Sequence, residues 1–131
     1  MSHIVEAKTS ISNPNRQLLT QAVQLVAQQH QGEIRNQYKG YFGQTYDVST
    51  GLVIYTQELH RGIGVDVKST GELTFVGDPF YVEALFEQVQ QEVVQMYVAL
   101  ASMQALQQLG YTTQALDGHN REVVIQGVAY A

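Results

Sequence analysis

The longest uninterrupted pattern in this sequence lies between Pro79 and Gly110, where neither glycine nor proline occurs. Apolar residues recur there at helical spacing, which predicts one long helix that ends at Gly110. About thirty residues at 1.5 Å each would make this helix roughly 45 Å long. A compact domain of this chain length has a diameter of roughly 36 Å, so a straight helix would extend beyond its own sheet.

The apolar residues of this long helix do not form one narrow stripe. Some suit packing against a sheet, whereas Phe86, Met96 and Met103 are assigned to a second surface, separated by uncharged glutamines. A helix surface so poor in charge favours contact with another protein surface. We therefore predict a homodimer in which this helix packs against its copy across a two-fold axis. The alternative is a helix that bends, or unwinds near Ser102, and buries these residues within one chain.

The rest of the chain alternates between strand and helix patterns. Asn13 followed by Pro14 predicts a helix start, as does Asp78 followed by Pro79. Strand patterns occupy residues 2–10, 33–38, 52–57, 63–67 and 73–76, and residues 111–129 form a hairpin pattern. This order predicts an α+β fold in which two helices pack on one face of an antiparallel sheet. It corresponds to a ferredoxin-like plan with extra strands, β-α-β-β-β-β-α-β-β, in a single domain covering residues 1–131.

Charge and composition exclude several classes of partner and site. A net charge of −5 disfavours binding to nucleic acid or an anionic membrane, and only Arg35, Lys39 and Arg61 support nucleic-acid binding. No apolar run is long enough to span a bilayer and no signal-peptide pattern opens the chain, so we expect a cytoplasmic or other intracellular protein. The absence of cysteine excludes disulfides, thiol nucleophiles and thiolate metal sites.

No catalytic motif is evident in the sequence. The segment Gly62-Ile63-Gly64 begins like a dinucleotide-binding fingerprint, but Val67 occupies the third glycine position and no helix pattern follows. The histidines show no metal-ligand spacing, although His3 and His60 remain candidates for a polar site beside the alternative of solvated or core roles. We therefore predict no catalytic residues, no metal and no cofactor.

Residues 38–45, with the sequence YKGYFGQT, admit two interpretations. In the structural one, Gly40 and Gly43 permit a bulge or kink in a strand, and the rings of Tyr41 and Phe42 point to opposite faces, one into the core. In the functional one, the outward ring forms a recognition surface with its polar neighbours. The candidate interaction residues are Lys39, Tyr41, Phe42, Gln44 and Thr45.

Short motifs along nearly the whole chain resemble one family. They are MSH with Lys8-Thr9 after it, GYFGQT, GIGVD at residues 62–66, and a DG pair before a β-rich tail. Together they resemble the hypothetical chloroplast reading frame 35 proteins of cyanobacteria and algal plastids, which have relatives in other bacteria. That family has Gln where this chain has Phe42, and it favours Arg-Tyr-Ala-Tyr where residues 92–97 read EVVQMY. The resemblance implies a fold but no activity, and it implies an AAA+ ATPase of the MoxR kind as a partner.

Two functions remain in contention at this point. The first is a non-catalytic interaction or adaptor protein, whose sheet edges could accept a partner strand. The alternative is a small-ligand-binding protein or small enzyme with its site between the sheet and residues 38–45. In that case His3, Tyr41 and His60 would supply the polar groups.

Overall fold

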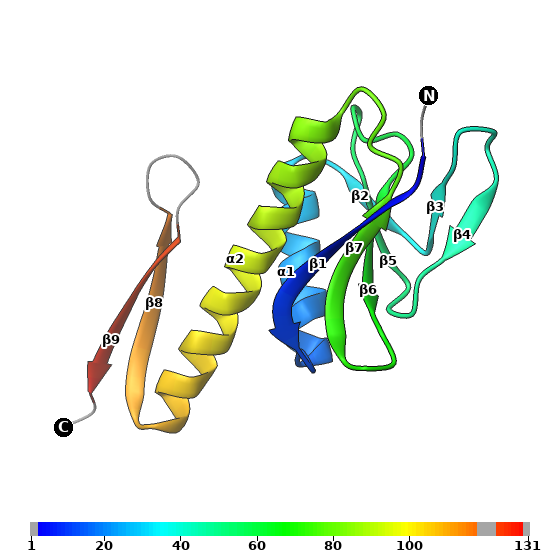
Figure 1. Ribbon diagram of the computed structural model, residues 1–131. Helices are drawn as coiled ribbons and strands as arrows, with labels where there is room; N and C mark the ends of the chain where they lie inside the picture. Colours follow the sequence, from blue (N-terminus) through cyan, green and yellow to red (C-terminus); the bar gives the residue numbers. More distant parts are fainter. Residues whose placement is uncertain (1–2, 118–122, 130–131) are drawn as a thin grey trace.

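The computed structural model describes the backbone of residues 3–117 and 123–129, and the side chains of residues 3–111. Its main sheet has five antiparallel strands in the order β1 (Val5–Ser12), β7 (Glu72–Gly77), β6 (Ile63–Val67), β5 (Leu52–Tyr55) and β2 (Glu33–Arg35). Helices α1 (Arg16–Gln29) and α2 (Glu83–Gln108) lie side by side against this sheet (Figure 1). The α+β class is therefore confirmed.

The ferredoxin-like plan is not confirmed. Six strands lie between the two helices, where four were predicted. The strands after α2, β8 (Tyr111–Asp117) and β9 (Val123–Ala129), form a two-stranded sheet of their own. The predicted hairpin is thus present, but it does not extend the main sheet. Its turn and His119 lie outside the described residues.

The two faces of the sheet are covered by different elements. Neighbouring residues of a strand point to opposite faces, and Val53 and Ile54 accordingly belong to separate hydrophobic clusters. Ile54 faces the helices, where it joins the main core. The principal members of that core are Leu19, Val23, Val26, Ile63, Val65, Leu73, Phe75, Phe86, Val89 and Val93.

A small ribbon of two strands covers part of the second face. Its strands β3 (Gln37–Lys39) and β4 (Thr45–Asp47) pair with each other, and the rings of Tyr38 and Tyr46 stack with their centroids 5.2 Å apart. Gly64 makes room for this ribbon, because a Cβ there would lie 2.8 Å from Cγ1 of Val48. Strand structure over residues 33–38 is confirmed, but not as one continuous strand: the chain bends at Asn36 and passes from one sheet to the other.

Both helices begin later than the sequence predicts. The cap of α1 is Asn15, whose Oδ1 accepts a hydrogen bond from the Leu18 N–H at 3.0 Å, whereas Asn13 has a φ of 51° and donates to Gly71 O. Helix α2 begins after Val82, without a side-chain cap, because the Asp78 carboxylate has other partners. None of the described helices is both long and apolar enough to cross a bilayer.

Helix α2 packs on two sides, and this accounts for its scattered apolar residues. One side contacts α1 and the core, and the β8–β9 hairpin contacts it as well (Figure 1). Phe86 is 4% exposed inside the core, so its assignment to a dimer surface is wrong, and Met96 also packs against the core. The helix is continuous through Ser102.

Polar contacts join the two helices near both ends of α1. The Asn15 N–H donates to the Tyr97 hydroxyl at 2.9 Å, and His30 Nε2 lies 2.6 Å from Glu92 Oε1. The side chains of His30 and Glu92 are 14% and 9% exposed. A hydrogen-bonded pair of this kind satisfies two polar groups that would otherwise be costly to bury.

Candidate functional site

Residues 40–44 form the tip of the β3–β4 ribbon. The Gly40 N–H donates to Gln44 O at 2.8 Å, and the Gly43 N–H donates to Gly40 O at 3.1 Å. Gly43 has a φ of 80°, the conformation that a glycine takes in a turn followed by a bulge. The predicted bend is therefore present, but it closes a hairpin and does not interrupt a strand.

Both rings at this tip lie outside the core. Tyr41 is 56% exposed and Phe42 is 86% exposed, and the rings meet edge to face with centroids 4.8 Å apart. The prediction that one of them enters the core is wrong, because residues at a turn are released from the alternation of a strand. The Gln44 side chain stabilises the turn, because its Oε1 accepts a hydrogen bond from the Phe42 N–H at 2.9 Å. Thr45, the next residue, is exposed.

Arg61 connects this tip with two other loops. Its Nη1 donates to Oδ2 of Asp78 at 2.9 Å, and its carbonyl accepts the Lys39 N–H at 2.8 Å. The guanidinium carbon lies 5.3 Å from the ring centre of Tyr41 and 5.8 Å from that of Phe80, within the range of cation–π attraction. One side chain therefore joins the ribbon, the β5–β6 turn and the β7–α2 loop.

The β7–α2 loop adds two more aromatic rings. Phe80 and Tyr81 contact each other with ring centroids 4.1 Å apart, and the Phe80 N–H donates to Oδ1 of Asp78 at 3.2 Å. Tyr81 is 84% exposed and has a φ of 67°, a conformation that is costly for a residue with a Cβ. We call Tyr41, Phe42, Phe80, Tyr81 and the central Arg61 the aromatic cluster.

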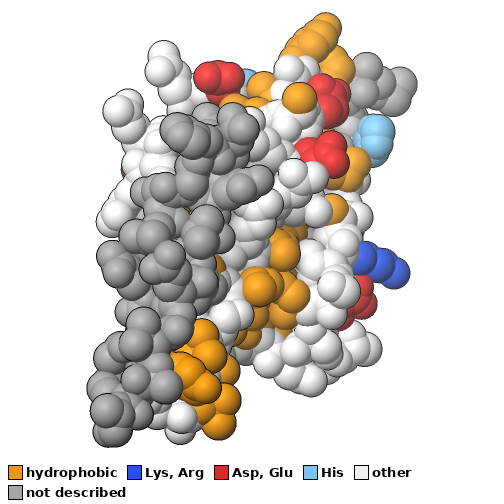
Figure 2. Space-filling view, turned by 90° about the vertical axis from the view of Figure 1, so that its left-hand side faces the viewer, with side chains coloured by type: hydrophobic (Ala, Val, Ile, Leu, Met, Phe, Trp, Pro, Cys, Tyr) orange, Lys and Arg blue, Asp and Glu red, His pale blue; other side chains and the backbone are white. Residues whose placement is uncertain are grey.

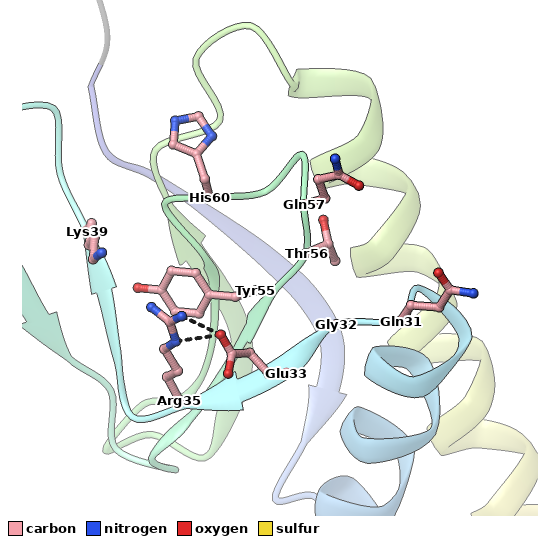
Figure 3. A pocket seen from close by; sticks show the side chains of 9 residues that line it. All are labelled: Gln31, Gly32, Glu33, Arg35, Lys39, Tyr55, Thr56, Gln57 and His60. Atoms are coloured by element: carbon pink, nitrogen blue, oxygen red, sulfur yellow. Dashed lines mark hydrogen bonds and ion pairs between the residues drawn. The ribbon is translucent and has the colours of Figure 1, made fainter.

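A polar groove of about 600 Å³ lies between the α1–β2 connection and the end of β3 (Figure 3). Tyr55 forms part of its wall, and the guanidinium of Arg35 and the ammonium of Lys39 lie 4.5 Å and 6.0 Å from its ring centre. The Tyr55 hydroxyl donates to Gln37 O at 2.6 Å. Burial raises the pKa of Tyr55, and the neighbouring Arg35 partly opposes this increase.

The structure does not bring the predicted polar residues together. His60 lines the groove and His3 is exposed, but neither His3 nor Tyr41 lines that groove. Among the residues whose side chains the structure describes, no three His, Cys, Asp or Glu side chains are grouped as a metal would require. Lys39 belongs to both regions, because its backbone contacts Arg61 and its ammonium faces Tyr55.

Two members of the aromatic cluster, Phe80 and Tyr81, were not predicted as interaction residues, and Arg61 was considered only for nucleic-acid binding. The sequence predicts Phe80 and Tyr81 at the start of the long helix, because Asp78-Pro79 resembles a helix cap. The adjacent pair of aromatic residues directly after proline was the available signal. The basic side chain of Arg61 did not indicate its place at the centre of this cluster, because that place depends on contacts among three loops that are distant in sequence.

Comparison with known proteins adds no relative: no protein-family model, curated protein or solved structure matches this chain. The resemblance to the chloroplast reading frame 35 family therefore stays a prediction that rests on its short motifs.

Proposed function

We propose that this protein is a non-catalytic interaction protein that binds a partner protein through the aromatic cluster. The observation that carries the proposal is the exposure of three rings, those of Tyr41, Phe42 and Tyr81, in a cluster that Arg61 joins through its contacts with Tyr41 and Phe80. Aromatic residues and arginine are the types enriched at the centres of protein interfaces. An aromatic ring buried there contributes a large apolar area with few rotatable bonds.

Backbone conformation supplies a second argument for this surface. The φ of Tyr81 costs about 1 kcal/mol or more, and the strained residue holds its ring in solvent, where it gains little within the chain. Strain of this kind persists only where neighbouring contacts impose it. The Asp78 contacts to Arg61 and Phe80, and the hydrogen bond from the Val82 N–H to Pro79 O, supply that constraint.

The test is a comparison of affinity captures from a native lysate. The double variant Phe42→Ser and Tyr81→Ser removes two exposed rings without touching the core, and Leu25→Ser is the matched control on the exposed side of α1. We expect a reproducible partner that the native chain and the control recover and the double variant loses. Equal recovery by all three chains, or no reproducible partner, would contradict the proposal.

The partner to test first is an AAA+ ATPase, because the sequence resemblance implies one. A purified ATPase recovered in the capture should bind the native chain directly and the double variant at least about tenfold more weakly, since each lost hot-spot ring is worth over 1 kcal/mol. Recovery of a different protein would retain the interaction function and remove the ATPase from the proposal.

Self-association through α2 is a second proposal. Fewer residues support it than the sequence predicts, because Phe86 and Met96 pack in or against the core. Val98 is 49% exposed and Met103 is partly exposed on this helix. Figure 2 shows separate groups of hydrophobic side chains on one face of the molecule, with the charged side chains toward its top and right-hand edge. Changing Val98 and Met103 together to glutamate should separate a dimer and leave a folded monomer. A monomer mass of the native chain in light scattering across a wide concentration range would remove this proposal.

A further inference from the structure

The groove beside β2 has the dimensions of a small-molecule site. Its volume of about 600 Å³ falls within the roughly 300–1,000 Å³ of ligand pockets. Its wall is formed by the α1–β2 connection, the edge strand β2, the end of β3, and the chain from Tyr55 to His60 (Figure 3). These segments also place the two basic side chains Arg35 and Lys39 at one side of it.

The basic side chains in this groove are opposite in sign to the net charge of the whole chain. Lys39 and Arg35 lie there in a protein of net charge −5. In the part of the chain with described side chains, the Lys39 ammonium forms no ion pair. Glu33 accepts hydrogen bonds from Nε and Nη2 of Arg35, whereas no described residue accepts one from Nη1. The groove therefore retains one uncompensated cation and further guanidinium N–H donors.

Contacts within the chain favour the positions of these two cations before any ligand arrives. Both lie over the ring of Tyr55, which is buried and fixed by its hydroxyl bond to Gln37 O. The backbone of Lys39 is fixed by its hydrogen bond to Arg61. Cations anchored on an aromatic ring lose less side-chain entropy when they bind an anion than solvated ones do.

We propose that this groove binds a small molecule with at least two negative charges carried by phosphate or carboxylate groups. Lys39 and Nη1 of Arg35 would contact the anion, and the Glu33 carboxylate on the other side of Arg35 would repel it toward Lys39. The proposal does not depend on the four rings of the aromatic cluster, because Tyr41, Phe42, Phe80 and Tyr81 do not line the groove.

The experiment is an NMR titration of the whole labelled chain with pyrophosphate and, separately, with citrate. We expect saturable shifts of the Lys39, Thr56, Gln57 and His60 amides at millimolar concentrations of at least one anion. Lys39→Gln should weaken that binding roughly tenfold, since a charge-assisted hydrogen bond is lost. Lys8→Gln is the matched control, because Lys8 is an exposed lysine of β1 outside the groove.

Each outcome decides the proposal. Saturation by pyrophosphate alone assigns phosphate chemistry, saturation by citrate alone assigns carboxylate chemistry, and saturation by both assigns a site for either group. The proposal is overturned if neither anion shifts the groove amides, or if the two lysine variants weaken binding equally, which would indicate attraction to the surface in general. Arg35→Gln provides a second variant should Lys39→Gln alter the spectrum of the ligand-free protein.

Discussion

Replacing Arg61 with methionine should destabilise the protein more than replacing its partner Asp78 with asparagine. The Asp78 side chain is 2% exposed and the Arg61 side chain 18% exposed, with 2.9 Å between Nη1 and Oδ2. Without Arg61 a buried carboxylate loses its counter-charge, which costs about 3–5 kcal/mol. Without the Asp78 charge, the more exposed guanidinium can still reach water, and the amide oxygen of the introduced asparagine can still accept the Phe80 N–H. We expect about 1–2 kcal/mol for that change.

The double variant gives the sharpest form of this prediction. With Arg61→Met and Asp78→Asn together no unpaired carboxylate remains, so the double variant should be more stable than Arg61→Met alone. Arg35→Met is the control, because Arg35 also pairs with a carboxylate and stacks on a tyrosine but its ion pair is exposed. Its loss should cost under about 1 kcal/mol.

Urea unfolding followed by circular dichroism at neutral pH measures all four variants. The comparison holds if the slope of the free energy of unfolding against urea stays constant across the series. The reasoning is refuted if Arg61→Met costs no more than Asp78→Asn, or if the double variant is no more stable than Arg61→Met. Either result would mean that the Asp78 carboxylate is hydrated.

Three further predictions concern the second face of the sheet. Gly64→Ala should cost about 1–3 kcal/mol, because the added methyl group would meet Val48, and urea midpoints that match the native chain would contradict this packing. Thr74→Val should raise the free energy of unfolding by up to about 1 kcal/mol, because the buried Thr74 hydroxyl has no hydrogen-bond partner among the described residues; a loss of stability would reveal one. Burial raises the pKa of Tyr38 and Tyr55, so the folded chain retains protons that the unfolded chain releases near the ordinary pKa of about 10. Stability should therefore be full below about pH 10 and fall as the pH rises above it, which urea midpoints at increasing pH would measure, with a shallower decline in Tyr55→Phe.

Local patterns predicted the elements of this fold better than their arrangement. The alternation of residues 63–67 and the helical spacing after Pro79 are properties of the segments themselves, and both elements are present. The bend at Asn36 and the ribbon over the second face depend on packing between distant segments, such as Gly64 beneath Val48. The hydrophobic periodicity of a single segment does not indicate contacts between distant segments.

The long helix shows why the elements that contact it could not be predicted from the sequence. Its apolar residues spread around the cylinder because both the core and the β8–β9 hairpin contact it. A second copy of the chain packed on this helix would require the same distribution of apolar residues. The pattern alone therefore does not distinguish contact with the hairpin from contact with a second chain. The candidate site was predictable at Tyr41 and Phe42, where glycines mark a turn, and not at Arg61, whose partners come from other loops.

The contacts of Arg61 also have a consequence for the speed of recognition. Three loops are joined by this residue, so docking of the proposed partner on the aromatic cluster would require no slow ordering step. Association should then be limited by diffusion and orientation, with rate constants of about 10⁵–10⁷ M⁻¹s⁻¹. Differences in affinity among partners would consequently lie in the dissociation rate. A variant that loosens Arg61 would lower the association rate constant, because the loops would then have to order after the encounter.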